Sequence, residues 1–232
     1  MPIEVVGVEE VFPGIYYVEF EDGRRALATR NLVPGHTVYD EKLVRYQGVE
    51  YRIWSPYRSK LAAAIHNGLK EVPIKEGSKI LYLGIASGTT ASHISDIIGL
   101  RGIIYGVEFA PRPLRDLVKV AEVRKNIIPL LKDARLPQEY AYIGESVDVL
   151  YADLAQPFQA EIFIKNAKMF LRKGGAGLIA IKARSIDVTR PPEEIFEEQK
   201  KILEEGGFEV VEGIRLDPYA RDHIMFRMIF KG

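Results

Sequence analysis

Cysteine is absent from the 232 residues of this chain. Its absence excludes disulfide bonds and thiolate-bound zinc, and it is typical of a protein that works in a reducing cytoplasm. The four histidines, His36, His66, His93 and His223, lie far apart and have no metal-ligand spacing. We therefore expect no metal site.

Long hydrophobic runs are also missing. No stretch approaches the roughly 18 apolar residues that a membrane-spanning helix needs. The opening, MPIEVVGVEE, lacks the basic and apolar regions of a signal peptide. We expect no membrane partner and a cytoplasmic location.

An excess of one charge is the third absence, since 32 basic residues balance 32 acidic ones. Any surface that binds nucleic acid must then be local, and it should bind RNA weakly on its own. Two segments, 52–70 and 112–125, have more basic than acidic residues. The basic rim that we expect consists of Arg52, Arg58, Lys60, Lys70, Arg112, Arg115, Lys119, Arg124, Lys125, Lys182, Arg184 and Arg190.

The first part of the chain has the pattern of β-hairpins. IYYVEF and RRALAT flank the turn EDG, and KLVRYQGVEYRIW alternates on both sides of Gln47-Gly48. These patterns predict a small N-terminal β domain over residues 1–54. Its acidic opening has the wrong sign for contact with phosphate, so we expect it to contact protein.

The period then becomes helical in YRSKLAAAIHNGL, for which we predict Ser55 as the cap and Pro56 as the first helical residue. Beyond it, apolar strands and amphipathic helices alternate, which predicts a parallel sheet covered on both faces. The strands are expected at 79–83, 103–107, 127–130, 147–152 and 176–182, and the helices at 89–98, 112–123, 159–171 and 191–205.

The last two apolar runs, FEVVEGIRL and HIMFRMIFKG, have only DPYARD between them. They should therefore pair as an antiparallel hairpin. Residues 55–232 then form an α/β domain with a seven-stranded, mostly parallel sheet and an antiparallel final strand. This layout resembles the Rossmann-like class I fold of S-adenosylmethionine-dependent methyltransferases.

A glycine turn follows the first strand of this sheet, in KILYLGIASGTT. Open α/β sheets bind ligands at the carboxyl ends of their strands, and such a turn lets the backbone approach a ligand closely. Glu108 ends the next strand, 24 residues after Gly84, where an acid accepts hydrogen bonds from ribose hydroxyls. The turn residues that we expect at a ribose-containing cofactor are Gly84, Ala86, Ser87, Gly88, Thr89 and Thr90.

The third strand leads into KDAR, where Asp133 and Ala134 are placed to bind an adenine, although Asp133 is also compatible with a plain helix cap. Ala86 stands where a dinucleotide-binding G-x-G-x-x-G turn has its second glycine. This favours S-adenosylmethionine, which has no pyrophosphate. A dinucleotide-dependent oxidoreductase remains the alternative enzyme.

Six motifs, in the order GIASGTT, YGVEFAPR, LLKDAR, DVLYADLAQP, IKARSID and DPYARDH, resemble the fibrillarin family in its short archaeal form. The resemblance extends to RNLVPGHTVY and YRIWSPYRSKLAAAI. It implies methyl transfer from S-adenosylmethionine to ribose 2′-hydroxyls of pre-rRNA and tRNA at nucleotides chosen by box C/D guide RNA. The implied particle also holds a Nop-type scaffold protein and a kink-turn-binding ribosomal-type protein.

The resemblance also implies site residues. Lys182 closes the strand GLIAIK and Asp153 closes VDVLYAD, so both should lie at the catalytic edge of the sheet. The implied catalytic residues are Lys60, Asp153, Lys182 and His223. The implied cofactor contacts are Thr89, Thr90, Glu108, Phe109, Asp133, Ala134, Asp153, Leu154, Ala155 and Gln156. A noncatalytic assembly subunit is the second alternative, against which the acid and lysine at strand ends argue.

Overall fold

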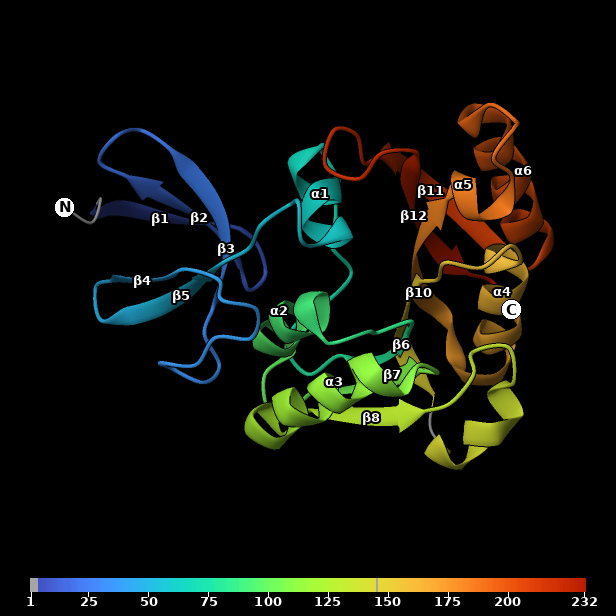
Figure 1. The fold of residues 1–232 in the computed structure, drawn as a ribbon, viewed down its shortest axis with the longest axis horizontal. Helices are drawn as coiled ribbons and strands as arrows, with labels where there is room; N and C mark the ends of the chain where they lie inside the picture. Colours follow the sequence, from blue (N-terminus) through green and yellow to red (C-terminus); the bar gives the residue numbers. More distant parts are fainter. Residues whose placement is uncertain (1–3, 145) are drawn as a thin grey trace.

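The computed structural model describes residues 4–144 and 146–232, which form two β-sheets and the helices between and around them (Figure 1). The smaller sheet is antiparallel, with the strand order β1-β2-β3-β5-β4. Its strands are β1 (Val5–Phe12), β2 (Ile15–Phe20), β3 (Arg25–Arg30), β4 (Leu43–Tyr46) and β5 (Val49–Ile53). Both hairpins expected from the sequence are confirmed.

The turn between β4 and β5 illustrates the local cause. Tyr46 pairs with Val49, which leaves two residues for the turn. Gln47 and Gly48 have φ of 48° and 82°, as a two-residue hairpin of the primed type requires. Glycine adopts this conformation at little cost, which is why Gln47-Gly48 marks the turn.

The larger sheet has seven strands in the order β11-β12-β10-β9-β6-β7-β8. Strand β12 is antiparallel to both of its neighbours, and the other neighbouring pairs are parallel. The strands are β6 (Lys79–Leu83), β7 (Ile103–Glu108), β8 (Ile127–Leu131), β9 (Val147–Asp153), β10 (Leu171–Lys182), β11 (Phe208–Arg215) and β12 (His223–Phe230). The expected fold class is confirmed.

Helices cover both faces of this sheet, because alternate residues of each buried strand point to opposite sides. Ile80 and Tyr82 pack with α1 (Lys60–His66), α2 (Thr89–Ile98) and α3 (Pro111–Arg124). Leu81 and Leu83 pack with α4 (Gln159–Phe170) and α6 (Pro192–Glu205) on the other face. Figure 1 shows α1, α2 and the smaller sheet on one side of the larger sheet, and α4 and α6 on the other. No described helix is long and apolar enough to cross a membrane.

The start of α1 corrects a prediction. Ser55 does not cap this helix, and Pro56 is not its first residue, because Ser55–Arg58 forms a turn in which the Arg58 amide donates to the Ser55 carbonyl at 3.1 Å. Proline suits the second position of such a turn as well as a helix start. The helix begins at Lys60, and Ser59 is its cap.

Three further elements lie outside the predicted pattern. β10 begins five residues earlier than expected, at Leu171, directly after α4. A 3₁₀ segment, η1 (Pro137–Ile143), follows β8, and a single-turn helix, α5 (Ala183–Ile186), follows β10. The two short elements, η1 and α5, have too few residues to show a period in the sequence.

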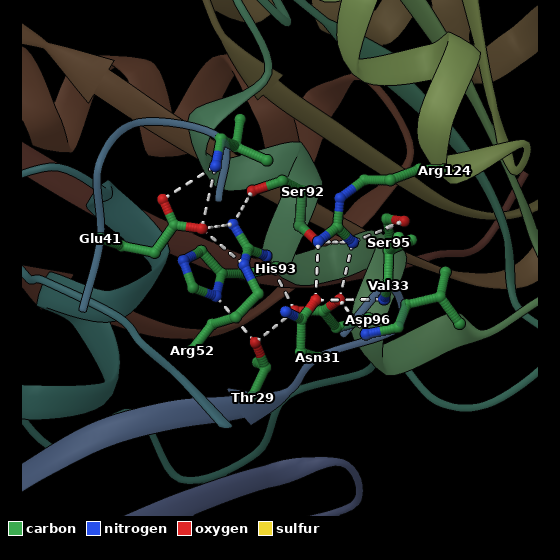
Figure 2. A network of polar contacts seen from close by, with 12 residues as sticks. Thr29, Asn31, Val33, Glu41, Arg52, Ser92, His93, Ser95, Asp96 and Arg124 are labelled. Carbon is green, nitrogen blue, oxygen red and sulfur yellow. Dashed lines mark hydrogen bonds and ion pairs between the residues drawn. The ribbon is translucent and has the colours of Figure 1, made fainter. Parts of the chain in front are cut away.

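A buried polar network joins the smaller sheet to α2 and α3 (Figure 2). Arg52 of β5 donates to Glu41 at 2.7 Å and to Asp96 of α2 at 2.8 Å, and its side chain is fully buried. Arg124 of α3 donates to the other Asp96 oxygen at 2.6 Å. Two arginines and two carboxylates therefore balance their charge inside the protein, as buried charges must. Arg52 and Arg124 were wrongly predicted in the basic rim, since neither reaches solvent.

His93 lies in the same network, stacked on Trp54 with ring centroids 4.8 Å apart. The Thr29 hydroxyl donates to Asp96, so its oxygen accepts from His93 Nδ1, which lies 2.8 Å away. His93 Nε2 then accepts from the Tyr39 hydroxyl at 2.6 Å. Burial, together with the nearby arginines, lowers the pKa of His93 well below its usual value, in agreement with a neutral ring.

Candidate active site

The site lies at the carboxyl edge of the larger sheet, between β6 and β9. The chain runs from β6 outward to β7 and β8 and then crosses back to β9, which lies on the other side of β6. Strand order reverses at this point, and open α/β sheets bind their ligands in the crevice that results. The Gly84 turn and Asp153 leave the sheet at this crevice.

Close approach of two backbones explains Gly84. A Cβ atom at this position would lie 2.2 Å from the Asp153 carbonyl oxygen, and the residue has φ of +74°. Both features exclude a side chain. The turn is therefore held against the end of β9, which brings cofactor-loop and catalytic candidates together.

Glu108 joins the turn to the end of β7. Its carboxylate accepts from the amide of Ala86 at 3.0 Å through one oxygen and from the amide of Ala110 at 3.0 Å through the other. The side chain is buried, and the two amides fix its orientation. Each carboxylate oxygen can accept a further hydrogen bond, so the group is preorganised for two neighbouring hydroxyls.

A cavity of about 320 Å³ lies beside this carboxylate. Its walls include most of the predicted cofactor contacts, and Phe109, whose exposed fraction is 62%, lies at its rim. The lining residues are Gly84, Ala86, Val107, Glu108, Phe109, Lys132, Ala134, Asp153, Leu154, Ala155 and Gln156. The structure thus gathers four successive strand ends around one hollow.

Other predicted contacts lie outside this cavity. Ser87 and Thr89 line a separate hollow next to residues 36–39, Arg58 and α3. The Thr90 hydroxyl donates to the Ser59 hydroxyl at 2.9 Å, which ties the start of α2 to the cap of α1. Gly88 is the N-cap of α2.

Asp133 contacts its own neighbour. Arg135 donates to both carboxylate oxygens, at 2.9 Å from the backbone and 2.6 Å from the guanidinium. These hydrogen bonds hold the pKa of Asp133 below its usual range. An adenine amino group would have to share this carboxylate with Arg135.

The four predicted catalytic residues come together on one face of the sheet. Asp153 pairs with Ala180 across β9 and β10, and Lys182 pairs with His223 across β10 and β12. Because side chains alternate along a strand, Lys182 shares the face of Ala180, and Asp153 shares the face of Tyr151, which packs with α1. Lys60, the first residue of α1, lies on this face too.

Lys60 and Asp153 make direct contact, with Nζ 2.5 Å from Oδ2. Their side chains are 26% and 30% exposed, so the pair is partly shielded from water. Asp153 also lines the cavity described above. The Lys182 ammonium has no hydrogen bond or ion pair with the described residues, whereas its backbone is held by Gln159.

A backbone hydrogen bond fixes one proton on the His223 ring. Nδ1 lies 2.7 Å from the Arg221 carbonyl, which only accepts, so Nδ1 carries a proton and Nε2 is an acceptor whenever the ring is neutral. Burial lowers the pKa of His223, and the Lys60 and Lys182 charges lower it further, against the opposing effects of the Arg221 carbonyl and Asp153. Lys60, Asp153 and Lys182 are therefore close enough to His223 to shift its pKa.

The sequence patterns missed three supporting residues. Lys132 lines the cavity, Ser59 bridges α1 to Thr90, and the Gln159 amide bonds to the backbone of Lys182. Lys132 adjoins the KDAR motif, and that adjacency is the one local signal. Ser59 and Gln159 act across long sequence separations, which no local pattern reports.

The whole chain matches known proteins. The Fibrillarin family model matches residues 6–232. The fibrillarin-like rRNA/tRNA 2′-O-methyltransferase of Methanocaldococcus jannaschii is 56% identical over 230 residues, which cover 99% of this chain and 100% of that protein.

Solved structures of fibrillarins also match this chain. A crystal structure of Aeropyrum pernix fibrillarin with natively bound S-adenosyl-L-methionine matches with a TM-score of 0.91 and 58% identity, covering 97% of this chain and 99% of the other. A fibrillarin/Nop5p complex matches with a TM-score of 0.85 and 42% identity, covering 97% and 100%. Together with the glycine turn, the Glu108 carboxylate and the four clustered side chains, these matches show that the chain belongs to the fibrillarin family.

Proposed function

We propose that this protein transfers a methyl group from S-adenosylmethionine to ribose 2′-hydroxyls of ribosomal and transfer RNA, at nucleotides chosen by box C/D guide RNA. One observation carries the proposal. Asp153 both lines the cavity at the sheet edge and binds the Lys60 ammonium. A single residue thus joins the candidate cofactor site to the candidate catalytic groups.

The cavity fits S-adenosylmethionine. The Glu108 carboxylate, oriented by two amides, suits the two ribose hydroxyls. Ala134 and Leu154 are buried apolar walls for an adenine, and Phe109 adds an exposed ring at the rim. The start of α2 has backbone amides for a carboxylate. When bound, this cofactor would supply a methyl group from its sulfonium sulfur, and S-adenosylhomocysteine, a neutral thioether at that sulfur, would be the leaving group.

The residues of the chain then orient the substrate and stabilise charge. A ribose oxygen must be held in line with the methyl group, and negative charge develops on it as its proton leaves. We assign stabilisation of that charge to the Lys182 ammonium, which has no competing partner in the described part of the chain. His223 Nε2 is an acceptor on the same face, and Asp153 orients Lys60.

We infer that partner proteins bring the RNA to this site. Burial of Arg52 and Arg124 reduces the expected basic rim. The exposed part that remains consists of Arg58, Lys70, Arg112, Arg115, Lys119 and Lys125, of which Lys119 pairs with Asp116. So few cations favour weak binding of RNA alone. We propose that a Nop-type scaffold, as in the related fibrillarin/Nop5p complex, and a kink-turn-binding protein present the guide and target RNAs.

Mass spectrometry of ribose methylation at a guided nucleotide tests the function. We expect methylation with scaffold, guide RNA and S-adenosylmethionine, and almost none when the guide is omitted. Equal methylation without a guide would contradict guided selection. Absence of methylation in the complete particle would contradict the activity. A division between two domains at residue 54 and a cytoplasmic location stay predictions.

A further inference from the structure

The last residue of β10, Lys182, extends beyond its pairing with β9, and the side chain of Gln159 binds its backbone there. β9 pairs with β10 only as far as Asp153 and Ala180, and β10 continues to Lys182. On that side the Lys182 amide and carbonyl have no strand partner. The Lys182 amide donates to Gln159 Oε1 at 3.0 Å, and Gln159 Nε2 donates to the Lys182 carbonyl at 3.2 Å.

We propose that Gln159 is a positioning residue for methyl transfer, which orients Lys182 through its backbone; this inference rests on the proposed function. The primary amide of Gln159 donates through its NH₂ group and accepts through its carbonyl oxygen, so it replaces the peptide group of an absent neighbouring strand. The side chain is fully buried, which keeps water from competing for the Lys182 backbone.

Gln159 also lies close in the chain to the candidate cofactor site. It is the first residue of α4, and it follows the cavity-lining segment 153–156 by only three residues. One end of the connection therefore lies at the candidate cofactor site and the other at Lys182. Loss of the two hydrogen bonds would free the backbone at Lys182, just where β10 changes into α5. A displacement of about 1 Å at a reacting group can lower a rate about 100-fold.

The test compares four variants in the assembled particle with guide and target RNA. Gln159→Met keeps the size of the side chain and removes both hydrogen bonds. Gln159→Glu keeps the acceptor and gains a donor only when it is protonated. Gln199→Met is the matched control, because Gln199 is also a buried helical glutamine but lies on α6. Lys182→Ala removes the side chain that Gln159 is proposed to position.

For Gln159→Met we expect kcat to fall about tenfold or more, with the KM for S-adenosylmethionine changed less than about twofold. Its thermal midpoint should be lower than that of Gln199→Met, because the Lys182 amide and carbonyl lose their partner. The activity of Gln159→Glu relative to the unchanged protein should rise as pH falls from about 8 to about 6, because burial raises the pKa of a carboxyl group.

Two outcomes would overturn the inference. One is equal kcat values for Gln159→Met and Gln199→Met. The other is that the activity of Gln159→Glu, relative to that of the unchanged protein, does not change with pH. This second outcome decides the question if Gln159→Met does not fold. Full activity in Lys182→Ala would instead remove Lys182 from the proposed function, so the two failures are distinguishable.

Discussion

The Lys60 ammonium and the Asp153 carboxylate lie 2.5 Å apart, although 93 residues separate them in the chain. Asp153 is at the end of β9 and Lys60 at the start of α1. The contact exists because α1 packs on the face of the sheet to which Asp153 points.

Asp153→Asn should therefore lower kcat about 100-fold or more, because it removes the carboxylate that orients Lys60 beside the reacting groups. Single-turnover methylation in the assembled particle measures this, with gel filtration to check assembly. Asp148→Asn is the control, since Asp148 lies near the opposite end of β9 and pairs with Arg172. Equal rates for the two variants would exclude a catalytic role for Asp153.

Gly84→Ala should destabilise the protein by at least about 3 kcal/mol, because the new methyl group would collide with the Asp153 carbonyl. Gly48→Ala is the control: it has a similar positive φ of +82° with nothing near its Cβ position. It should cost about 1–2 kcal/mol. Urea unfolding measures both. Equal losses would show that the backbones do not approach as closely as described.

Glu108→Gln should weaken S-adenosylhomocysteine binding about tenfold or more, because hydrogen bonds to a charged acceptor are worth about 1.5–3 kcal/mol. Isothermal titration calorimetry gives the dissociation constant. Glu122→Gln, on the exposed side of α3, should leave it unchanged. Unaltered binding in Glu108→Gln would remove the ribose contact from the proposal.

Arg52→Met should lower the free energy of unfolding by about 3–5 kcal/mol, because Glu41 and Asp96 would remain buried with too little positive charge. Arg101→Met breaks an exposed pair with Glu76 and should cost less than about 1 kcal/mol. Chemical denaturation of both variants checks this. A small loss for Arg52→Met would mean that the network relaxes or admits water.

Stability should fall as the solution becomes acidic below a pH of about 6.5, the usual pKa of histidine. Burial lowers the pKa of His93 in the folded protein, so at lower pH the unfolded chain binds a proton that the folded chain refuses. Each such histidine contributes stability that is fully present above the usual pKa and is lost on acidification, with a slope of up to about 1.4 kcal/mol per pH unit. His66 and His223 are shifted in the same direction.

The free energy of unfolding, measured from about pH 7.5 to about pH 5, tests this dependence. His93→Gln should have a shallower slope than the unchanged protein, because the group that takes up the proton on unfolding is gone. An identical slope in the variant would assign the effect to other groups.

The larger sheet could be predicted because its information is local. Apolar runs such as Lys79–Leu83 and Val147–Asp153 report burial residue by residue, and alternation with helices requires parallel strands. Parallel strands share one carboxyl edge, so Gly84, Glu108 and Asp153 could be assigned to a common site before their distances were known.

The helix cap at Ser59 and the burial of Arg52 could not be predicted in this way. Ser55-Pro56 satisfies the rules for a turn and for a helix start equally well, and packing of α1 against the sheet selects the turn. Arg52 has the same local pattern as an exposed strand residue. Its environment depends on Asp96, 44 positions away.

By itself, then, the sequence determined the alternation of the main strands and helices of the larger sheet, the strand ends that form the site and the family. Tertiary structure alone decided which charges are buried, that Lys60 contacts Asp153, and that Gln159 completes the end of β10. The reason is physical: hydrophobic period and turn preference act between near neighbours, whereas a buried ion pair or a two-point amide contact depends on partners that folding brings together.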